Sequence, residues 1–180
     1  AAQHFHLLRR QVKRNFRKPL IVMSPKSMLR VATSQFQDLV KGHFHEVLDD
    51  PEFAAGADRK SVMRVIFCSG KIYHELNDRR KKLGRKDVAI VRLEQLHPFH
   101  AEAIGAVQAS YPAKAERVWV QEEPRNAGAY HFVTDQFQQH FGLRLGYIGR
   151  ATSATPAVGS KHAPEHQHEA ILTSAIGRGP

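Results

Sequence analysis

Residues 65–93 read VIFCSGKIYHELNDRRKKLGRKDVAIVRL, and this stretch decides the fold class. Its two ends are short apolar runs, typical of strands that are buried on both faces of a sheet. Between them, Ile72, Leu76 and Leu83 lie on one face of a predicted helix. Gly84 follows, a residue type that commonly ends helices. A strand, a helix and a second strand in this order predict a crossover unit with two parallel strands.

The same alternation extends over most of the chain. Downstream, strands are predicted at 117–120 and 143–148, and helices from Pro98 onward, at about 128–140 and at 165–176. Upstream, the patterns predict a helix at 3–15, a doubly buried strand at 20–23 (LIVM) and a strand at 44–48. We therefore predict an α/β fold, with an open, largely parallel sheet of about five strands and helices on both faces.

The composition is that of an ordinary globular domain. Of the 180 residues, 42% are apolar and 24% are charged, which excludes a disordered or collagen-like chain. No apolar run approaches the ~20 residues that a membrane-spanning helix needs, so no membrane partner is predicted. The single cysteine, Cys68, excludes a disulfide framework and a Cys-rich zinc site, and its apolar surroundings predict an inert core thiol.

The positive charge is concentrated at the start of the chain. The formal net charge is +10, and residues 1–30 contain eight lysines and arginines and no acid, so the rest of the chain adds only +2. Single-strand nucleic-acid binders interleave aromatic and basic residues, and this chain lacks that pattern, so no nucleic-acid partner is predicted. An Arg-rich, acid-free start is also typical of a mitochondrial transit peptide, but residues 1–23 contain no Ser or Thr.

Polar loops follow the predicted strands. In an open α/β sheet, ligands meet the loops at the carboxyl ends of the strands. Three of the loops place a cation beside the start of a helix, an arrangement suited to anions. The same Ser, Gly, Asn and charged residues also cap helices, so both interpretations stay open. The five loops lie at 24–27, 69–71, 94–98, 121–126 and 149–153.

The sequence contains no complete active site. The run Ser69-Gly70-Lys71 resembles the end of a phosphate-binding loop, but the upstream glycine and the final Ser or Thr of that motif are missing. No G-x-G-x-x-G fingerprint occurs. The histidines form three H-x-H pairs whose spacing fixes no third ligand, so neither a metal site nor a catalytic residue is predicted. These pairs are His4/His6, His43/His45 and His166/His168, with His162 four residues before His166.

Six long motifs resemble one enzyme family. They read FHLLRRQ (5–11), FRKPLIVMSPKSMLR (16–30), CSGKIYHEL (68–76), VAIVRLEQLHPF (88–99), WVQEEPRNAGAY (119–130) and GRATSATPAVGS (149–160). Together they resemble the carboxyl-terminal region of the 2-oxoglutarate dehydrogenase decarboxylating component, an enzyme that depends on thiamine diphosphate. The resemblance covers residues 3–177 in order.

This resemblance implies a supporting part of a larger enzyme. Family members decarboxylate 2-oxoglutarate on thiamine diphosphate and pass the succinyl group to the lipoyl arm of dihydrolipoyl succinyltransferase, in the tricarboxylic acid cycle. The cofactor and its Mg²⁺ are expected in two preceding domains, so residues 1–180 alone are expected to be inactive. The resemblance also implies a homodimer, located in the bacterial cytoplasm or the mitochondrial matrix.

The resemblance also implies a domain boundary. Residues 17–180 would form the third domain, similar to the transketolase carboxyl-terminal domain. Residues 1–16 would be the tail of the preceding pyrimidine-binding domain or a linker helix. In that arrangement, the arginines near the start of the chain pair with acids of the absent domains. These arginines are Arg9, Arg10, Arg14 and Arg17.

Two alternatives stay open: the same domain of a 2-oxoadipate dehydrogenase, and a non-catalytic module for dimerisation or regulation. Some actinobacterial relatives carry an acetyl-CoA activator site in this domain. Arg30 and Gln95 match that site, but His43, Glu46 and residues 101–103 depart from it, so we do not expect the site here. A nucleotide effector is a further hypothesis, with Arg9, Lys26, Arg30, Lys71 and Gln95 as candidate residues.

Overall fold

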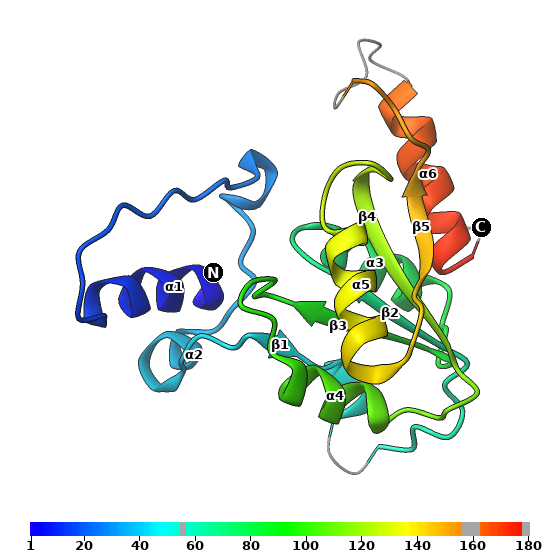
Figure 1. Ribbon diagram of the computed structural model, residues 1–180, viewed down its shortest axis with the longest axis horizontal. Helices are drawn as coiled ribbons and strands as arrows, with labels where there is room; N and C mark the ends of the chain where they lie inside the picture. Colours follow the sequence, from blue (N-terminus) through cyan, green and yellow to red (C-terminus); the bar gives the residue numbers. More distant parts are fainter. Residues whose placement is uncertain (55–56, 156–162, 178–180) are drawn as a thin grey trace. The chain divides into compact units, whose positions relative to one another are not determined.

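The computed structural model describes residues 1–54, 57–155 and 163–177. Within it the chain divides into two compact units, Ala1–His45 and Glu46–Pro180. Figure 1 shows the course of the chain, and the two units are described separately below. The predicted boundary between residues 16 and 17 stays a prediction. No described helix is long and apolar enough to cross a membrane.

The first unit is built from short helices and extended chain. Its elements are α1 (Ala2–Lys13), the 3₁₀ helix η1 (Lys26–Met28) and α2 (Phe36–Lys41). The Gln3 side chain holds α1 to the end of the unit, because it donates to the His45 carbonyl at 2.7 Å and accepts from the His45 amide at 3.0 Å. His6 Nε2 lies 2.7 Å from the Asp38 carbonyl oxygen and joins α1 to α2.

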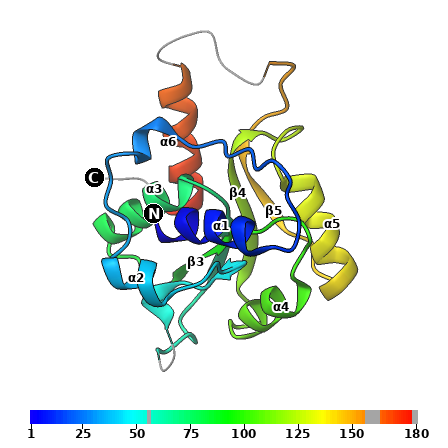
Figure 2. The same cartoon turned by 90° about the vertical axis from the view of Figure 1, so that its left-hand side faces the viewer.

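The predicted strand at 20–23 is wrong for this structure. Residues 14–25 instead form an extended trace that leads from α1 to η1 (Figure 2). The Ile21 and Met23 side chains are 84% and 89% exposed. A doubly buried strand needs neighbouring strands and two covering layers, and residues 1–45 contain no strand at all.

The second unit carries the predicted sheet. Its five strands lie in the order β1-β3-β2-β4-β5. β2, β3, β4 and β5 run parallel, and β1 pairs antiparallel to β3. The strands are β1 (Val47–Leu48), β2 (Arg64–Cys68), β3 (Val88–Leu93), β4 (Glu116–Pro124) and β5 (Gly146–Arg150). The predicted fold class is therefore confirmed.

Helices cover both faces of this sheet (Figure 1). α3 (Ile72–Lys82) and α6 (Ala163–Ala175) pack on the face that carries Ile66. α4 (Ala101–Ala109) and α5 (Tyr130–Phe141) pack on the face that carries Phe67 and Trp119. Successive side chains of a strand point to opposite faces, so the apolar run of β2 feeds both cores.

Several boundaries differ from the sequence predictions. The strand predicted at 44–48 shrinks to β1, because only Val47 and Leu48 pair with β3, and the chain then continues into the 3₁₀ helix η2 (Pro51–Phe53). The helix predicted from Pro98 begins at Ala101, where the imidazole of His100 accepts from the Ala103 amide at 3.3 Å. The last strand begins three residues later than predicted, because Gly146 is the first of its residues that pairs with β4.

Candidate functional site at the carboxyl edge of the sheet

Four of the five polar loops lie at one edge of the sheet. The loops at 69–71 and 94–98 follow β2 and β3, whereas those at 121–126 and 149–153 include the last residues of β4 and β5, because these two strands extend further than predicted. The carboxyl ends of parallel strands meet at the same edge. The fifth loop, residues 24–27, belongs to the first unit and follows no strand. The sequence therefore located this edge correctly in four cases.

Lys71 stands at this edge, directly before α3. Its ammonium group contacts the carboxylate of Glu122 on β4 and lies 3.2 Å from a carboxylate oxygen of Glu75 on α3. Burial lowers the pKa of Lys71, but these two carboxylates outweigh it and the pKa is raised overall. The second oxygen of Glu75 contacts Nε2 of His168 on α6. An incoming anion would therefore compete with two carboxylates for the Lys71 charge.

Gln121 organises the loop that follows β4. Its side-chain oxygen accepts from the Trp119 indole at 2.8 Å and from the Tyr130 amide at 3.1 Å. Its side-chain nitrogen donates to the carbonyls of Pro124 and Ala127 at 3.1 and 2.8 Å. One buried amide thus fixes the backbone between β4 and α5. The sequence analysis did not single out Gln121, although a lone Gln at the end of an apolar strand is a usable signal.

Gly128 allows this loop to approach Gln121 closely. Its φ is +67°, and a Cβ at this position would lie 2.9 Å from the Gln121 side-chain amide. Both features favour glycine, because other residues rarely adopt this backbone conformation. The turn also explains why α5 begins at Tyr130, two residues later than the predicted start of that helix at about residue 128.

Arg125 presents a guanidinium group at the same edge. It lies 5.4 Å from the ring centre of Tyr130 and 5.5 Å from that of Tyr147. Its backbone amide donates to the Arg150 carbonyl at 3.0 Å, which ties the loop to the end of β5. Among the described residues, no carboxylate forms an ion pair with Arg125. An exposed guanidinium on an aromatic platform is suited to a carboxylate or a phosphate.

The loops after β4 and β5 are also joined by side chains. Asn126 donates to the Ser153 carbonyl at 3.0 Å and accepts from the Ser153 amide at 3.1 Å. The Tyr147 hydroxyl donates to the Arg150 carbonyl at 2.6 Å. These contacts make the carboxyl edge a preorganised scaffold.

The remaining candidates at this edge are structural. The Gln95 side chain donates to the Pro98 carbonyl at 3.0 Å and so closes its own loop. Cys68 is completely buried, and burial raises the pKa of its thiol to about 12. Such a thiol stays protonated near neutral pH and is a poor nucleophile, which confirms the inert core thiol.

The five proposed effector residues are divided between the two units. Lys71 and Gln95 lie at the carboxyl edge of the second unit, whereas Arg9, Lys26 and Arg30 belong to the first. Arg9 donates to the Gly42 carbonyl at 3.4 Å, and Lys26 and Arg30 are exposed. The structure therefore brings together two of the five, and the effector hypothesis stays a prediction.

The histidine pairs do not assemble into a metal site among the described residues. No group of three His, Cys, Asp or Glu side chains in that part of the chain is placed to hold a metal ion. On α1, His4 is exposed and His6 is buried, as expected for an H-x-H pair on a helix. The rings of His43 and His45 lie 4.0 Å apart and pack on each other. His162 lies outside the described residues.

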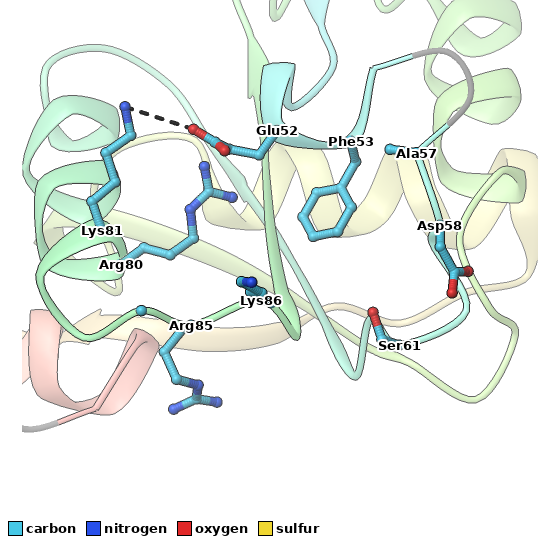
Figure 3. A pocket seen from close by; sticks show the side chains of 10 residues that line it. Glu52, Phe53, Ala57, Asp58, Ser61, Arg80, Lys81, Arg85 and Lys86 are labelled. Carbon is cyan, nitrogen blue, oxygen red and sulfur yellow. Dashed lines mark ion pairs between the residues drawn. The ribbon is translucent and has the colours of Figure 1, made fainter.

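A hollow of about 410 Å³ lies at the opposite, amino edge of the sheet. Figure 3 shows the Phe53 ring between basic side chains on one side and Asp58 and Ser61 on the other. Most of these cations are already paired. Arg80 contacts the buried Asp50, and Lys81 lies 3.6 Å from a carboxylate oxygen of Glu52. The hollow is therefore a weaker candidate for anions than its basic lining implies.

The fold and this edge define the class: an open α/β domain with a preorganised polar edge and, in the residues described, no complete catalytic constellation. Comparison with known proteins then identifies the family. The 2-oxoglutarate dehydrogenase C-terminal family model matches residues 33–176. The chain belongs to this family.

Full-length relatives agree with this assignment. The chain is 46% identical to the 2-oxoglutarate dehydrogenase E1 component of Cupriavidus necator, and the match covers 98% of this chain and 19% of the relative. It is 43% identical to the 2-oxoadipate dehydrogenase complex component E1 of Homo sapiens, over 97% of this chain and 19% of the relative. The chain thus spans about a fifth of the length of these relatives.

Proposed function

We propose that this chain is the carboxyl-terminal part of a 2-oxoglutarate dehydrogenase decarboxylating component. The observation that carries the proposal is a match over nearly the whole chain, at 46% identity, to a protein of that name. The full-length enzyme would oxidatively decarboxylate 2-oxoglutarate on thiamine diphosphate and transfer the succinyl group to a lipoyl group.

In this proposal the chain supports catalysis rather than performing it. Thiamine diphosphate supplies the carbanion-stabilising chemistry when it is bound. No group of three His, Cys, Asp or Glu side chains among the described residues is placed to hold a metal ion, and we propose that the cofactor and its metal bind in the preceding part of the longer polypeptide. The second unit would contribute its carboxyl edge, whose loops are held in place through Gln121, Asn126 and Arg125.

The same proposal includes the partners of the longer polypeptide. It would form a homodimer and deliver its product to dihydrolipoyl succinyltransferase, in a bacterial cytoplasm or a mitochondrial matrix. A nucleotide effector that binds Arg30 remains part of the proposal. An unchanged effector affinity in an Arg30→Ala variant of the full-length protein would remove Arg30 from it.

A second candidate substrate is 2-oxoadipate. A 2-oxoadipate dehydrogenase component is 43% identical to this chain, close to the 46% of the 2-oxoglutarate enzyme. Sequence identity over this chain therefore does not distinguish the two candidate substrates. We place substrate choice in the preceding part of the protein.

The test is a decarboxylation assay with thiamine diphosphate and Mg²⁺ on the full-length protein and on residues 1–180 side by side. We expect turnover of 2-oxoglutarate by the full-length protein and none by the isolated chain. Faster turnover of 2-oxoadipate would favour the second candidate. Turnover by residues 1–180 alone would contradict the supporting role.

A further inference from the structure

The first unit exposes an unusual amount of apolar surface. Among the large apolar side chains of the described residues, only Met63 and Phe132 are exposed in the second unit. All the others that are exposed lie within residues 1–45, and we call them the N-terminal apolar surface. Its members are Phe5, Leu8, Val12, Phe16, Leu20, Ile21, Met23, Leu29, Val31, Phe36 and Val40. Large exposed apolar patches usually mark a surface that binds another protein.

The exposed apolar residues of α1 follow a regular spacing along the helix. Phe5, Leu8 and Val12 recur at helical spacing, as on a helix that buries one face. In the first unit these side chains are 44%, 44% and 71% exposed. The described residues thus cover this apolar face of the helix only in part.

The segment at 20–23 shows the same conflict. Its sequence, LIVM, is typical of a strand with layers on both sides, yet Ile21 and Met23 are almost fully exposed. Among the described residues, no backbone hydrogen bond joins residues 19–24 to another segment. Buried backbone groups need partners, and the edge of a sheet would supply them along the whole of an extended apolar run.

The charge of the first unit narrows the choice of partner. Residues 1–45 contain nine lysines and arginines and one acid, Asp38, whose carboxylate accepts from the Gln35 amide. A complementary surface is therefore apolar and rimmed with carboxylates. Another copy of the same unit is equally basic and would repel it. The second unit, with Met63 and Phe132 as its exposed large apolar residues, offers little apolar area to match.

The remaining candidate for the complementary surface is the rest of a longer polypeptide. The family match is to a C-terminal domain, and the relatives are about five times longer than this chain. We infer that the N-terminal apolar surface docks onto the preceding part of the same polypeptide. In that complex, residues 20–23 add as a strand to a sheet edge, and the cations of α1 face carboxylates. The inference rests on the proposed function only in requiring the longer polypeptide.

Hydrogen exchange on the full-length protein and on residues 1–180 tests this docking. We expect the amides of residues 20–23 to exchange at least about tenfold more slowly in the full-length protein. The amides of β2 serve as an internal reference and should exchange similarly in both. Equal exchange of residues 20–23 in the two proteins would overturn the inference. Slowing that appears in residues 1–180 alone as concentration rises would identify a second copy as the partner and also overturn it.

Substitution gives an independent readout. We expect Ile21→Asp to lower the thermal midpoint of the full-length protein by several degrees and to leave that of residues 1–180 unchanged. Met63→Asp is the matched control, since Met63 is an exposed apolar residue of the second unit and should change neither midpoint. An unchanged midpoint in full-length Ile21→Asp would contradict the docking. Slow exchange of residues 20–23 in a full-length protein that decarboxylates neither 2-oxo acid would instead contradict the proposed function and leave the docking intact.

Discussion

The two units of this chain differ in what they bury. The second unit has two apolar cores, one on each face of its sheet. In the first unit the only buried residue is a histidine, His6. Both sequences contain apolar runs and an amphipathic helix, so local pattern alone does not separate them. The difference teaches that the run 65–68 becomes a core strand because helices that cover it follow in the same chain. Among the described residues, no helix or strand buries the run 20–23.

The strongest test of this comparison removes a buried charge from the second unit. Asp50 is 1% exposed, contacts the guanidinium of Arg80 and accepts from the Ile90 amide at 2.6 Å. Asp50→Ala leaves Arg80 buried without its carboxylate, so we expect a loss of about 3–5 kcal/mol in the free energy of unfolding. Urea denaturation of residues 1–180 measures it. Asp58→Ala, at an exposed aspartate, is the control, and equal effects of the two changes would contradict the prediction.

The next largest loss in the free energy of unfolding is expected from a change at the carboxyl edge. Gln121→Ala leaves the Trp119 indole and the Tyr130 amide without their buried acceptor. We expect a loss of about 2 kcal/mol, together with a change in the fluorescence of Trp119, the single tryptophan. Gln139→Ala on the exposed face of α5 should change neither quantity by a measurable amount. If Gln121→Ala were as mild as this control, the loop would not depend on that amide.

The sequence predicted the features that depend on residues close together in the chain, and missed those that depend on residues far apart. The strands and helices of the second unit were predicted because their signals are local: apolar runs, helical spacing and glycine turns. The ion pair of Asp50 and Arg80 was not predicted, because its members are thirty residues apart in the chain and neither lies in a recognisable motif. Long-range contacts of this kind become visible only when the sheet is assembled.

The candidate site shows the same limit. Lys71 was predicted to favour an anion because it precedes a helix, and its position at the carboxyl edge is as expected. The carboxylate of Glu122 reaches it from another strand, so the tertiary fold supplies the anion from within the chain. The strand predicted at 20–23 does not form for the opposite reason: its apolar pattern is typical of a strand between neighbours, and no strand in the described part of the chain pairs with it.

Removing the Lys71 ion pairs should change the free energy of unfolding by a smaller amount. The folded-state pKa of Lys71 is raised above its ordinary value of 10.5, so the stabilisation is fully present below that pH and is lost as pH rises through the folded-state pKa. Because the side chain is partly exposed, we expect Lys71→Met to cost less than about 1 kcal/mol near neutral pH. We therefore expect the difference in the free energy of unfolding between Lys71→Met and the parent protein to shrink above about pH 10, as measured by urea denaturation at a series of pH values. A difference that grows with pH would contradict the assignment.

The smallest expected effect is that of Ile21→Ala, and its comparison with Ile66→Ala gives the sharpest contrast between the units. Ile21 and Ile66 are the same residue type in runs that both read as buried strands, yet Ile21 is 84% exposed and Ile66 is fully buried. In residues 1–180, Ile66→Ala should cost about 2–5 kcal/mol, because it removes packed methyl groups and leaves a cavity. Ile21→Ala should stay within about 0.5 kcal/mol of the parent, since an exposed side chain has little packing to lose. Urea denaturation of the two variants checks both values. A cost of Ile21→Ala approaching that of Ile66→Ala would mean that residues 1–180 bury the run 20–23 by themselves. The first unit would then bury its apolar run as the second unit does.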